Sequence, residues 1–255
     1  MKNVYWLVLL GGLAFSVIFS AASSSDEKMT ITLATTDWCP YTCIERGDGS
    51  NIIGQYITEI LADHDIVLEI RSFPWSRAVK LAEQGLVDGL LTATRVEAPT
   101  LSFTQTPITN FSLCFYTLNN EKWRYHSPLA LGNLSLGVIK GYGYNDEIDQ
   151  YIQNNPANLV VLTGDEGVSR LLAMLKRQRV DVIVEDKRVL NWEINQNGLD
   201  VSNVNNAGCT TPQPFYLAMN QYNQQNAAVL TLLNQALAEK VNLQKLRVLF
   251  KKYAL

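Results

Sequence analysis

The sequence predicts an α/β protein made of two similar units, each with a mostly parallel sheet flanked by helices. Three observations lead to this class. Strand-like and helix-like segments alternate along most of the chain, and a helix–strand pair recurs at a fixed offset. The third is the length of 255 residues, which accommodates two units of about 100 residues each. Alternating strands and helices favour parallel sheets covered by helices.

The first unit reads as strand, helix, strand, helix, strand. Met29–Ala34 and Ile66–Phe73 alternate apolar and polar residues, which is typical of half-buried strands. Ile52–Ala62 and Trp75–Gln84 have apolar residues at helical spacing. Val87–Leu91 is a short apolar run, as expected of a strand that is buried on both faces.

The same order recurs in the second half of the chain. It follows another predicted strand, and it again alternates short apolar runs with segments of helical spacing. The predicted strands and helices of this half are Phe111–Leu118, Leu134–Ile139, Asp146–Gln153, Leu159–Leu162, Val168–Arg177 and Val180–Val184.

The last helix–strand pair of each half aligns without a gap at an offset of 93 residues. Chance is the alternative, because short helix–strand pairs share a pattern of apolar and polar residues in any case. Shared Ser-Arg and Val-Asp pairs at one offset favour duplication or structural equivalence. The matching residues are Ser76-Arg77 with Ser169-Arg170, Val87-Asp88 with Val180-Asp181, Leu90-Leu91 with Ile183-Val184, and Arg95 with Arg188.

The composition is that of an ordinary globular protein. The chain carries 24 acidic and 21 basic side chains, for a formal net charge of −3. This balance argues against a nucleic-acid partner, because phosphate binding needs a basic surface. Eight Pro and 15 Gly without a period indicate turns rather than low complexity.

The first 22 residues have the layout of a secretory signal peptide. A short positive start, Met1-Lys2-Asn3, precedes the apolar run from Val4 to Phe19 and the small residues Ser20-Ala21-Ala22. The alternative is an uncleaved anchor, but the run is shorter than the roughly 20 residues of a membrane span. No Cys follows the run directly, so a lipid anchor is not expected. We therefore expect export to the periplasm and cleavage near Ala22.

Four cysteines remain in the exported chain: Cys39, Cys43, Cys114 and Cys209. In an oxidising compartment an even number of cysteines indicates disulfides. Four cysteines allow three pairings, and the sequence does not choose among them. A tight Cys39–Cys43 loop with Cys114–Cys209 joining distant segments is the preferred pairing. A zinc site is the alternative, but these spacings do not form paired C-x-x-C knuckles.

Two α/β units predict a cleft at the carboxyl ends of their strands. After the third strand of the first unit come Thr92, Thr94 and Arg95, and after its equivalent in the second unit come Glu185 and Asp186. Hydroxyl groups and a guanidinium thus face a pair of carboxylates. This arrangement suits a small zwitterion, because Arg binds carboxylates and Asp or Glu receives an ammonium group.

Aromatic residues stand at the same predicted edge. Trp38 and Tyr41 follow the first strand, and Trp75 and Arg77 follow the second. Two flat aromatic faces can sandwich a planar or aliphatic group or hold a cation. The alternative is that these tryptophans belong to the core.

A glycine turn in the second unit is a further candidate. Gly141, Tyr142 and Tyr144 lie between a predicted strand and a helix that begins near Asn145-Asp146. Backbone N–H groups and the positive end of a helix at such a turn favour an anion. The turn matches neither dinucleotide nor phosphate-loop motifs, so a carboxylate or hydroxyl of a small ligand is the better match. A plain turn is the alternative.

These motifs together resemble the periplasmic solute-binding proteins of the polar amino-acid type, extracellular solute-binding family 3. The resemblance covers nearly the whole exported chain and depends on the order and spacing of several segments. Those segments are Pro74-Trp75-Ser76-Arg77-Ala78, Gly85-Leu86-Val87-Asp88, Ala98-Pro99-Thr100-Leu101-Ser102-Phe103, Trp123-Arg124-Tyr125, Leu136-Gly137-Val138-Ile139-Lys140-Gly141-Tyr142, and Arg179-Val180-Asp181-Val182-Ile183-Val184-Glu185-Asp186.

The resemblance implies a two-lobed periplasmic-binding-protein-like fold of type II, with two hinge crossings. Residues 1–22 would be the signal peptide and residues 23–110 the first part of lobe 1. Lobe 2 would comprise residues 111–221, and residues 222–255 would return to lobe 1 as C-terminal helices.

The resemblance also implies roles for single residues. Trp38 and Trp75 match the pair that sandwiches the ligand side chain, Thr92 matches a hydroxyl contact, and Asp186 matches the carboxylate that receives an α-ammonium group. One segment departs from the family. Where amino-acid binders carry an Arg that clamps the α-carboxylate, this chain reads Glu97-Ala98-Pro99. Arg95 or Arg77 is then the candidate clamp, and without either a different small polar ligand fits better.

From these features we expect an exported, monomeric receptor that needs no cofactor and no metal. It would capture an amino acid or a similar small polar solute and deliver it to the membrane permease of an ABC transporter. One alternative is a ligand-binding partner of a sensor. Another is a small enzyme on the same scaffold, similar to a cyclohexadienyl dehydratase, which would need a positioned general acid or base.

Overall fold

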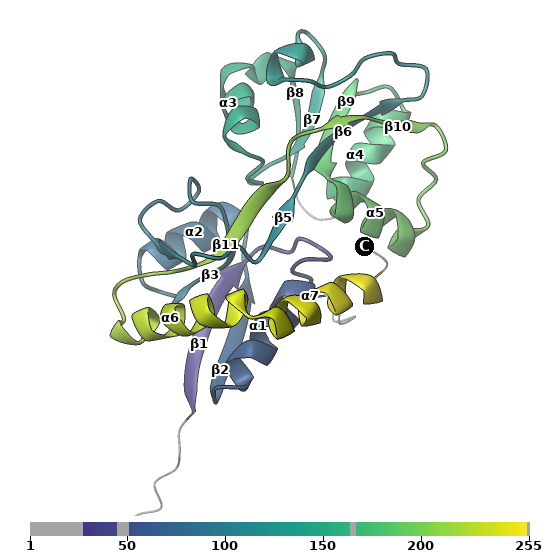
Figure 1. Cartoon of the computed structure of the whole chain (residues 1–255). Helices are drawn as coiled ribbons and strands as arrows, with labels where there is room; N and C mark the ends of the chain where they lie inside the picture. The colour runs from purple at the N-terminus through teal and green to yellow at the C-terminus, as the bar shows by residue number, and fades with distance from the viewer. Residues whose placement is uncertain (1–27, 45–50, 164–166, 254–255) are drawn as a thin grey trace, which may run out of the picture.

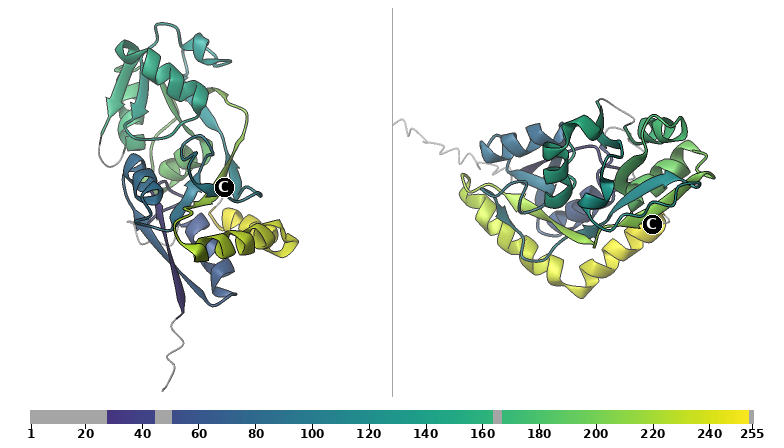
Figure 2. Two further views of the ribbon diagram at one scale, coloured as in Figure 1. Left: turned by 90° about the vertical axis from the view of Figure 1, so that its left-hand side faces the viewer. Right: turned by 90° about the horizontal axis from the view of Figure 1, so that it is seen from above.

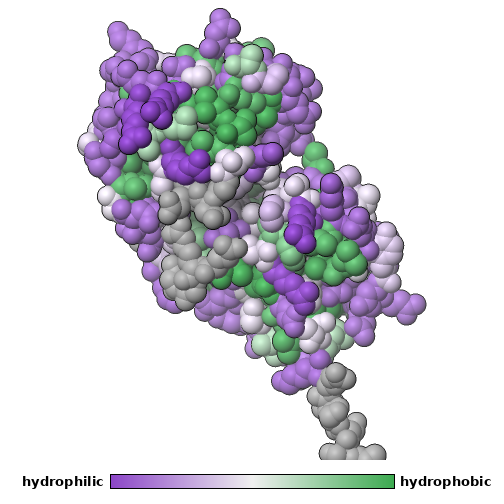
Figure 3. All heavy atoms as spheres, turned by 180° about the vertical axis from the view of Figure 1, so that it is seen from behind, coloured by the Kyte–Doolittle hydropathy of each residue, from purple (hydrophilic) through white to green (hydrophobic). Residues whose placement is uncertain are grey.

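The computed structural model describes residues 28–44, 51–163 and 167–253. The predicted signal peptide, residues 1–22, lies outside the described residues. Figure 1 shows two lobes, one above the other, each built around its own sheet. Figure 3 shows the same division from behind as two masses with mixed hydrophilic and hydrophobic surfaces. Within the described part of the chain, no helix is both long and apolar enough to cross a membrane.

The first lobe contains a mixed sheet with the strand order β2-β1-β3-β11-β4, and β5 pairs with β11 beside this path. β1 runs parallel to β2 and β3, whereas β11 is antiparallel to β3, β4 and β5. The elements of this lobe are β1 (Met29–Thr35), α1 (Ile52–Ala62), β2 (Ile66–Ser72), α2 (Trp75–Glu83), β3 (Gly89–Ala93), β4 (Ser102–Phe103), β5 (Thr109–Phe111), β11 (Gln213–Met219), α6 (Gln224–Ala238) and α7 (Lys240–Lys252).

The second lobe contains a mixed sheet with the order β10-β6-β9-β7-β8. β7 is parallel to β8 and β9, whereas β6 is antiparallel to β9 and β10. The elements of this lobe are β6 (Leu113–Leu118), the 3₁₀ helix η1 (Pro128–Leu131), β7 (Leu136–Ile139), α3 (Asp146–Asn154), the 3₁₀ helix η2 (Pro156–Asn158), β8 (Leu159–Leu162), α4 (Gly167–Lys176), β9 (Val182–Asp186), α5 (Lys187–Asn197) and β10 (Val204–Cys209).

The sequence repeat corresponds to equivalent structure in the two lobes. β3 begins at Gly89 and β9 at Val182, so both strands follow the offset of 93 residues read from the sequence. Each of these residues also pairs in parallel with an earlier strand of its own sheet, Gly89 with Leu33 of β1 and Val182 with Leu136 of β7. Structural equivalence of the two helix–strand units is thereby confirmed.

The repeated Val-Asp pair has a structural role in both lobes. Asp88 accepts a hydrogen bond from the backbone N–H of Thr32 at 2.9 Å. Asp181 accepts bonds from the backbone N–H and the hydroxyl of Ser135, at 2.8 and 2.7 Å. Each carboxylate thus ties the start of the third strand to the first strand of its sheet.

Two crossings connect the lobes. Because of them, the sheets and the end of lobe 2 differ from the sequence-based expectation. One crossing runs from β5 through Ser112 into β6, and the other runs from β10 into β11. Each sheet is mixed rather than mostly parallel, because the crossing strands enter antiparallel to the third strand. The expected end of lobe 2 at Gln221 lies after β11, a strand that pairs within the first sheet.

Helix α1 illustrates how local sequence determines an element. The side chain of Asn51 caps the helix by accepting a hydrogen bond from the backbone N–H of Gly54. Ile53, Ile57 and Ile60 then repeat at helical spacing and are all buried. Helix α7 packs against α1, and Figure 2 shows α6 and α7 along the outer edge of the molecule.

Both preferred disulfides are present. Cys39–Cys43 closes a short loop after β1, and Cys114–Cys209 joins β6 to β10, where the two cysteines face each other in the ladder. The bonded cysteines therefore offer no thiolates to a metal ion.

Candidate functional site

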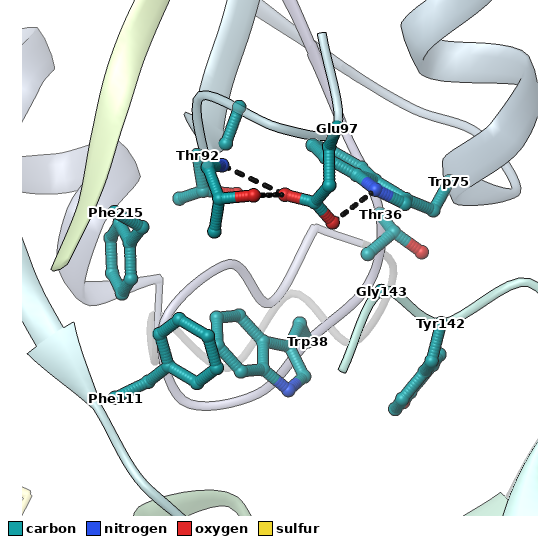
Figure 4. A pocket seen from close by; sticks show the side chains of 11 residues that line it. Thr36, Trp38, Trp75, Thr92, Glu97, Phe111, Tyr142, Gly143 and Phe215 are labelled. Atoms are coloured by element: carbon teal, nitrogen blue, oxygen red, sulfur yellow. Dashed lines mark hydrogen bonds between the residues drawn. The ribbon is translucent and has the colours of Figure 1, made fainter. Parts of the chain in front are cut away.

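A small cavity lies between the lobes at the carboxyl ends of β1 and β3 (Figure 4). Its volume of about 50 Å³ corresponds to on the order of three to five water-sized positions. We call it the inner cavity. Residues of both lobes and both crossings line it, namely Thr36, Trp38, Trp75, Thr92, Ala93, Thr94, Glu97, Phe111, Tyr142, Gly143 and Phe215.

A wider cavity of about 630 Å³ adjoins the inner one and shares Thr36, Trp75 and Tyr142 with it. We call this the outer cavity. Lys140 is the one basic side chain among its described lining residues. The other lining residues are Asp37, Cys39, Ser72, Phe73, Pro74, Ile139, Gly141, Gly167, Val168, Val189, Glu193 and Asn197.

Aromatic rings form one wall of the inner cavity. Trp38 meets Phe111 and Phe215 edge-on, with ring centroids 5.9 Å apart in both pairs. Phe111 ends β5 and Phe215 lies in β11, so both chain crossings contribute a ring to this wall. Trp38 is held by a short loop in which its backbone exchanges two hydrogen bonds with Thr42. The Cys39–Cys43 disulfide closes the same loop.

Glu97 and Trp75 form the opposite wall. The Glu97 carboxylate accepts hydrogen bonds from the indole N–H of Trp75 at 2.8 Å, the backbone N–H of Thr94 at 2.7 Å and the Thr94 hydroxyl at 2.8 Å. Burial raises the pKa of Glu97, the three hydrogen bonds oppose that shift, and the nearby Asp146 adds a smaller increase. Figure 4 shows this carboxylate across the cavity from Trp38 and Phe111.

The glycine turn of the second lobe closes the cavity from the other side. Tyr142 and Gly143 line the inner cavity, and Gly141 lines the outer one. A methyl group added to Gly143 would overlap the carboxylate of Glu97. Tyr144 lies behind the turn, where its buried hydroxyl accepts a hydrogen bond from the backbone N–H of Ile139 at 2.7 Å.

The helix after this turn begins with a side-chain cap and an acidic first turn. Asn145 caps α3 by accepting a hydrogen bond from the backbone N–H of Ile148. Asp146, Glu147 and Asp149 then occupy the first turn of the helix. The expectation that this helix end favours a ligand carboxylate stays a prediction, and the three acidic residues in its first turn act against it by adding negative charge there.

The two acidic residues at the end of β9 lie outside both cavities. Asp186 is the N-cap of α5 and accepts hydrogen bonds from the backbone N–H groups of Arg188 and Val189, at 2.8 and 3.1 Å. Its second oxygen accepts a bond from the backbone N–H of Ser112 at 2.9 Å. The carboxylate expected to receive an ammonium group is thus engaged in holding the helix and the crossing.

Glu185 is completely buried beside it. One of its oxygens accepts a hydrogen bond from the backbone N–H of Asp186 at 2.7 Å. Burial raises the pKa of Glu185 to about 8, and the neighbouring Asp186 contributes to the increase. The indole of Trp38, a residue of the inner cavity, also interacts with this carboxyl group and opposes part of the rise in its pKa.

Arg188 fastens the lobes together next to this pair. Its guanidinium donates hydrogen bonds to the Tyr41 hydroxyl at 3.1 Å and to the carbonyl of Asn110 at 2.9 Å. It also lies over the ring of Phe250, 4.8 Å from the centroid. Tyr41 in turn donates to Asp186 at 3.2 Å. Four segments of the chain meet at this one side chain, which we call the Arg188 latch.

Neither candidate carboxylate clamp lines a cavity. Arg95 donates a hydrogen bond to the carbonyl of Thr104 at 3.0 Å and lies over the ring of Tyr216 at 4.5 Å. Arg77 is exposed and lies over the ring of Phe73 at 5.4 Å. Both guanidinium groups pack against rings of lobe 1, outside the described lining of both cavities.

The structure therefore divides the candidate residues into three sets. The inner cavity gathers Trp38, Trp75, Thr92, Thr94 and Tyr142, the outer cavity adds Gly141, and Tyr41, Tyr144, Glu185, Asp186, Arg77 and Arg95 lie elsewhere.

Sequence reasoning did not assign Glu97, Phe111, Phe215 or Gly143 to the site. Glu97 was visible as the departure from the family pattern, at the place where an Arg was expected. Phe111 and Phe215 left no signal, because they reach the cavity only through the two crossings.

No family model matches the sequence, and no curated protein matches it. Solved structures do match. An ancestral arginine-binding protein bound to arginine is similar with a TM-score of 0.69 and 18% identity, over 89% of this chain and 98% of its own. A histidine kinase sensor domain with similarity to periplasmic binding proteins has a TM-score of 0.69 and 16% identity, over 89% of this chain and 96% of its own.

The holo form of ArgBP from T. maritima is similar with a TM-score of 0.63 and 15% identity, over 89% of this chain and 96% of its own. At these identities the likeness establishes a shared fold. The two mixed sheets flanked by helices, with two crossings between them, agree with it. The chain therefore has the two-lobed fold of the type II periplasmic binding proteins.

Proposed function

We propose that the chain is an exported, monomeric receptor that captures a small polar solute between its lobes and delivers it to a membrane transporter. The fold supports binding, since two of the similar structures are described as bound to arginine and to glutamine. The signal-peptide pattern and the two disulfides support an oxidising compartment outside the cytoplasm.

One observation carries this proposal: the inner cavity is lined from both lobes and from both crossings. A ligand there contacts lobe 1 through Trp75 and lobe 2 through Tyr142, so it has full contacts only when the lobes are closed. A ligand that binds one of two conformations better shifts the population toward that conformation. Capture and closure would thus be one event, which a transporter can recognise.

A thermal-shift screen against amino acids, small acids and small amines tests the proposal. A solute that binds only the folded chain raises the melting temperature with its concentration. If no solute in the screen raises it, the receptor function is wrong.

A pair of tryptophan variants then tests the location of binding. Trp75→Ala should weaken binding of the active solute at least tenfold while the protein still unfolds cooperatively. Trp123→Ala is the control, because Trp123 packs in lobe 2 and donates a hydrogen bond to the carbonyl of Ala130. It should lower the stability and leave the affinity unchanged. Equal affinity in the wild type and Trp75→Ala would refute the cavity as the site.

A sensor is the second candidate function, favoured by the likeness to a histidine kinase sensor domain. Uptake of the radiolabelled solute by cells that lack this protein distinguishes a transport receptor from a sensor. Lost uptake supports transport, whereas normal uptake with a lost response to the solute supports a sensor.

Catalysis is the third candidate, and the receptor proposal predicts that the solute is not converted. Glu185 and Asp186, the acidic residues considered for it, are buried outside the cavity lining. Mass spectrometry of the solute after incubation should recover it unchanged. A converted product would establish an enzyme instead.

A further inference from the structure

The inner cavity contains a buried carboxyl group that forms no ion pair with the described residues. Glu97 is the one ionisable carboxyl group, and no basic side chain occurs, among the eleven described residues that line it. All three of its hydrogen-bond donors, from Trp75 and Thr94, are neutral. No ion pair among the described residues includes Glu97. A carboxylate removed from water is stabilised by a cation, so a positively charged ligand would complete this site.

The position of Glu97 leaves one of its oxygens able to accept another bond. Thr94 donates twice to Oε2, in the manner of a capping box that stabilises the turn from Thr94 to Glu97. Trp75 donates once to Oε1. A carboxylate has about four lone-pair sites, so Oε1 retains capacity for a donor within the cavity.

The remaining walls also favour a cation. Rings of Trp38, Trp75, Phe111, Tyr142 and Phe215 line the cavity. The faces of aromatic rings are negative and attract an ammonium or guanidinium group. Figure 4 shows the rings of Trp38, Phe111 and Phe215 on the side of the cavity opposite the carboxylate of Glu97.

Among the described residues, a ligand carboxylate finds no cationic partner in the inner cavity. Arg77 and Arg95 pack elsewhere in lobe 1, and Asn145 caps the helix that follows the glycine turn. The basic side chain among the described lining of the outer cavity is Lys140, which is exposed. A carboxylate beside Glu97 would be repelled by it.

We propose, building on the receptor function above, that the inner cavity binds the positively charged end of a small amine or guanidine, and that the ligand needs no carboxylate. The cavity volume of about 50 Å³ suits a head group of roughly three to five non-hydrogen atoms. The rest of the ligand extends into the outer cavity. The site would then select a ligand by its positively charged group, whereas an Arg clamp would select an α-amino acid by its carboxylate.

Two matched pairs of compounds test the ligand class by calorimetry on the exported chain. Agmatine is arginine without its carboxylate, and putrescine is ornithine without its carboxylate. In at least one pair the decarboxylated compound should bind, and it should bind as tightly as its parent or more tightly. If the parent binds more tightly than its decarboxylated partner in both pairs, the proposal is overturned.

Charge variants test the role of Glu97. Glu97→Gln removes the charge but leaves one acceptor oxygen, which can serve Trp75 or the backbone N–H of Thr94 and not both, so the urea midpoint is measured beside the affinity. The substitution should weaken binding of agmatine or putrescine at least tenfold. Glu69→Gln is the control, because Glu69 is an exposed residue of β2 paired with Arg71. It should change the affinity less than twofold, and equal affinities in both variants would overturn the assignment of Glu97.

Failure of this inference and failure of the receptor function give different results. If neutral or anionic solutes raise the melting temperature and none of the cationic compounds binds, the ligand class is wrong and the receptor function stands. If no solute of any class raises it, the receptor function itself is wrong.

Discussion

An arginine follows the equivalent strand in each lobe, and the two arginines have different contacts. Arg95 follows β3 and Arg188 follows β9 at the equivalent position, 93 residues later. Arg95 binds the carbonyl of Thr104 and stacks on Tyr216, all within lobe 1. Arg188 instead reaches Tyr41 of the other lobe.

This difference indicates a division of labour between the lobes. Lobe 1 supplies most of the inner cavity, including Trp38, Trp75 and Glu97. Lobe 2 supplies the glycine turn that lines the cavity and the Arg188 latch that joins the two lobes. Duplicate strands therefore provide equivalent scaffolds, and the side chains at their ends have separate tasks.

The largest expected effect contrasts the two disulfides. Cys114–Cys209 spans 95 residues, and Cys39–Cys43 spans 4. Because a disulfide restricts the unfolded chain more when it closes a longer loop, replacing Cys114 and Cys209 by Ser should cost about 4–5 kcal/mol, and replacing Cys39 and Cys43 about 2 kcal/mol. Urea unfolding measures both. Equal losses would show that the loop around Trp38 contributes more than chain entropy.

The next effect concerns the buried carboxyl of Glu185. Its folded pKa of about 8 lies above its ordinary value of 4.5, so the folded protein keeps a proton that the unfolded chain loses between these values. Stability should therefore fall as the pH rises from about 4.5 to 8, with the full cost present above 8. Glu185→Gln should remove the share of this fall that Glu185 contributes and gain about 4 kcal/mol at pH 8. A residual fall should remain, because burial also raises the pKa values of Glu97, Asp149 and Asp186.

Chemical unfolding of the wild type and Glu185→Gln across this pH range tests the expectation. Glu121→Gln, a change at an exposed residue of lobe 2, is the control and should keep the slope of the wild type. If the stability of Glu185→Gln fell with pH as steeply as that of the wild type, the raised pKa of Glu185 would be contradicted.

A smaller effect compares the two equivalent arginines directly. Arg188→Ala removes hydrogen bonds to Tyr41 and Asn110. It also removes the positive charge that lies near the buried carboxyl group of Asp186. We expect a loss of about 2 kcal/mol. Arg95→Ala removes one hydrogen bond at an exposed residue, so it should cost less than about 1 kcal/mol. Unfolding in urea measures both, and equal losses would contradict the latch.

The smallest expected effect is on closure. Gly143→Ala adds a methyl group where the turn of lobe 2 meets Glu97. The closed form should become less favourable by about 1 kcal/mol, which lowers the apparent affinity about fivefold to tenfold. The urea midpoint should stay near that of the wild type, because the clash exists only when the lobes meet. Unchanged affinity with a lower midpoint would place the strain within lobe 2.

Much of the fold could be predicted because it depends on neighbouring residues. Helix α1 was predicted over its observed bounds, since its cap and its row of isoleucines are local features. The offset of 93 residues identified β3 and β9 as equivalent strands. Strand β11 was missed as a member of the first sheet, because its partners β3, β4 and β5 lie more than 100 residues earlier in the chain.

The site could be predicted less completely for the same reason. Trp38, Trp75 and Thr92 were found because they follow the carboxyl ends of strands, where a parallel sheet gathers its ligand residues. Phe215 reaches the cavity only because the chain crosses back, and that crossing has no local signature. The direction of Arg95 depends on Tyr216, which joins it through the same distant strand.

By itself the sequence determined the α/β class, the duplicated helix–strand unit and the positions of several cavity residues, because hydrophobic periodicity and strand ends are local properties. The preferred disulfide pairing also agreed with the structure, although the choice among three pairings required distances between segments. Only the tertiary structure decided how the charges are distributed. It directed Arg95 away from the cavity, placed Arg188 between the lobes and left Glu97 among aromatic rings, since packing partners brought together by the two crossings determine where a side chain points.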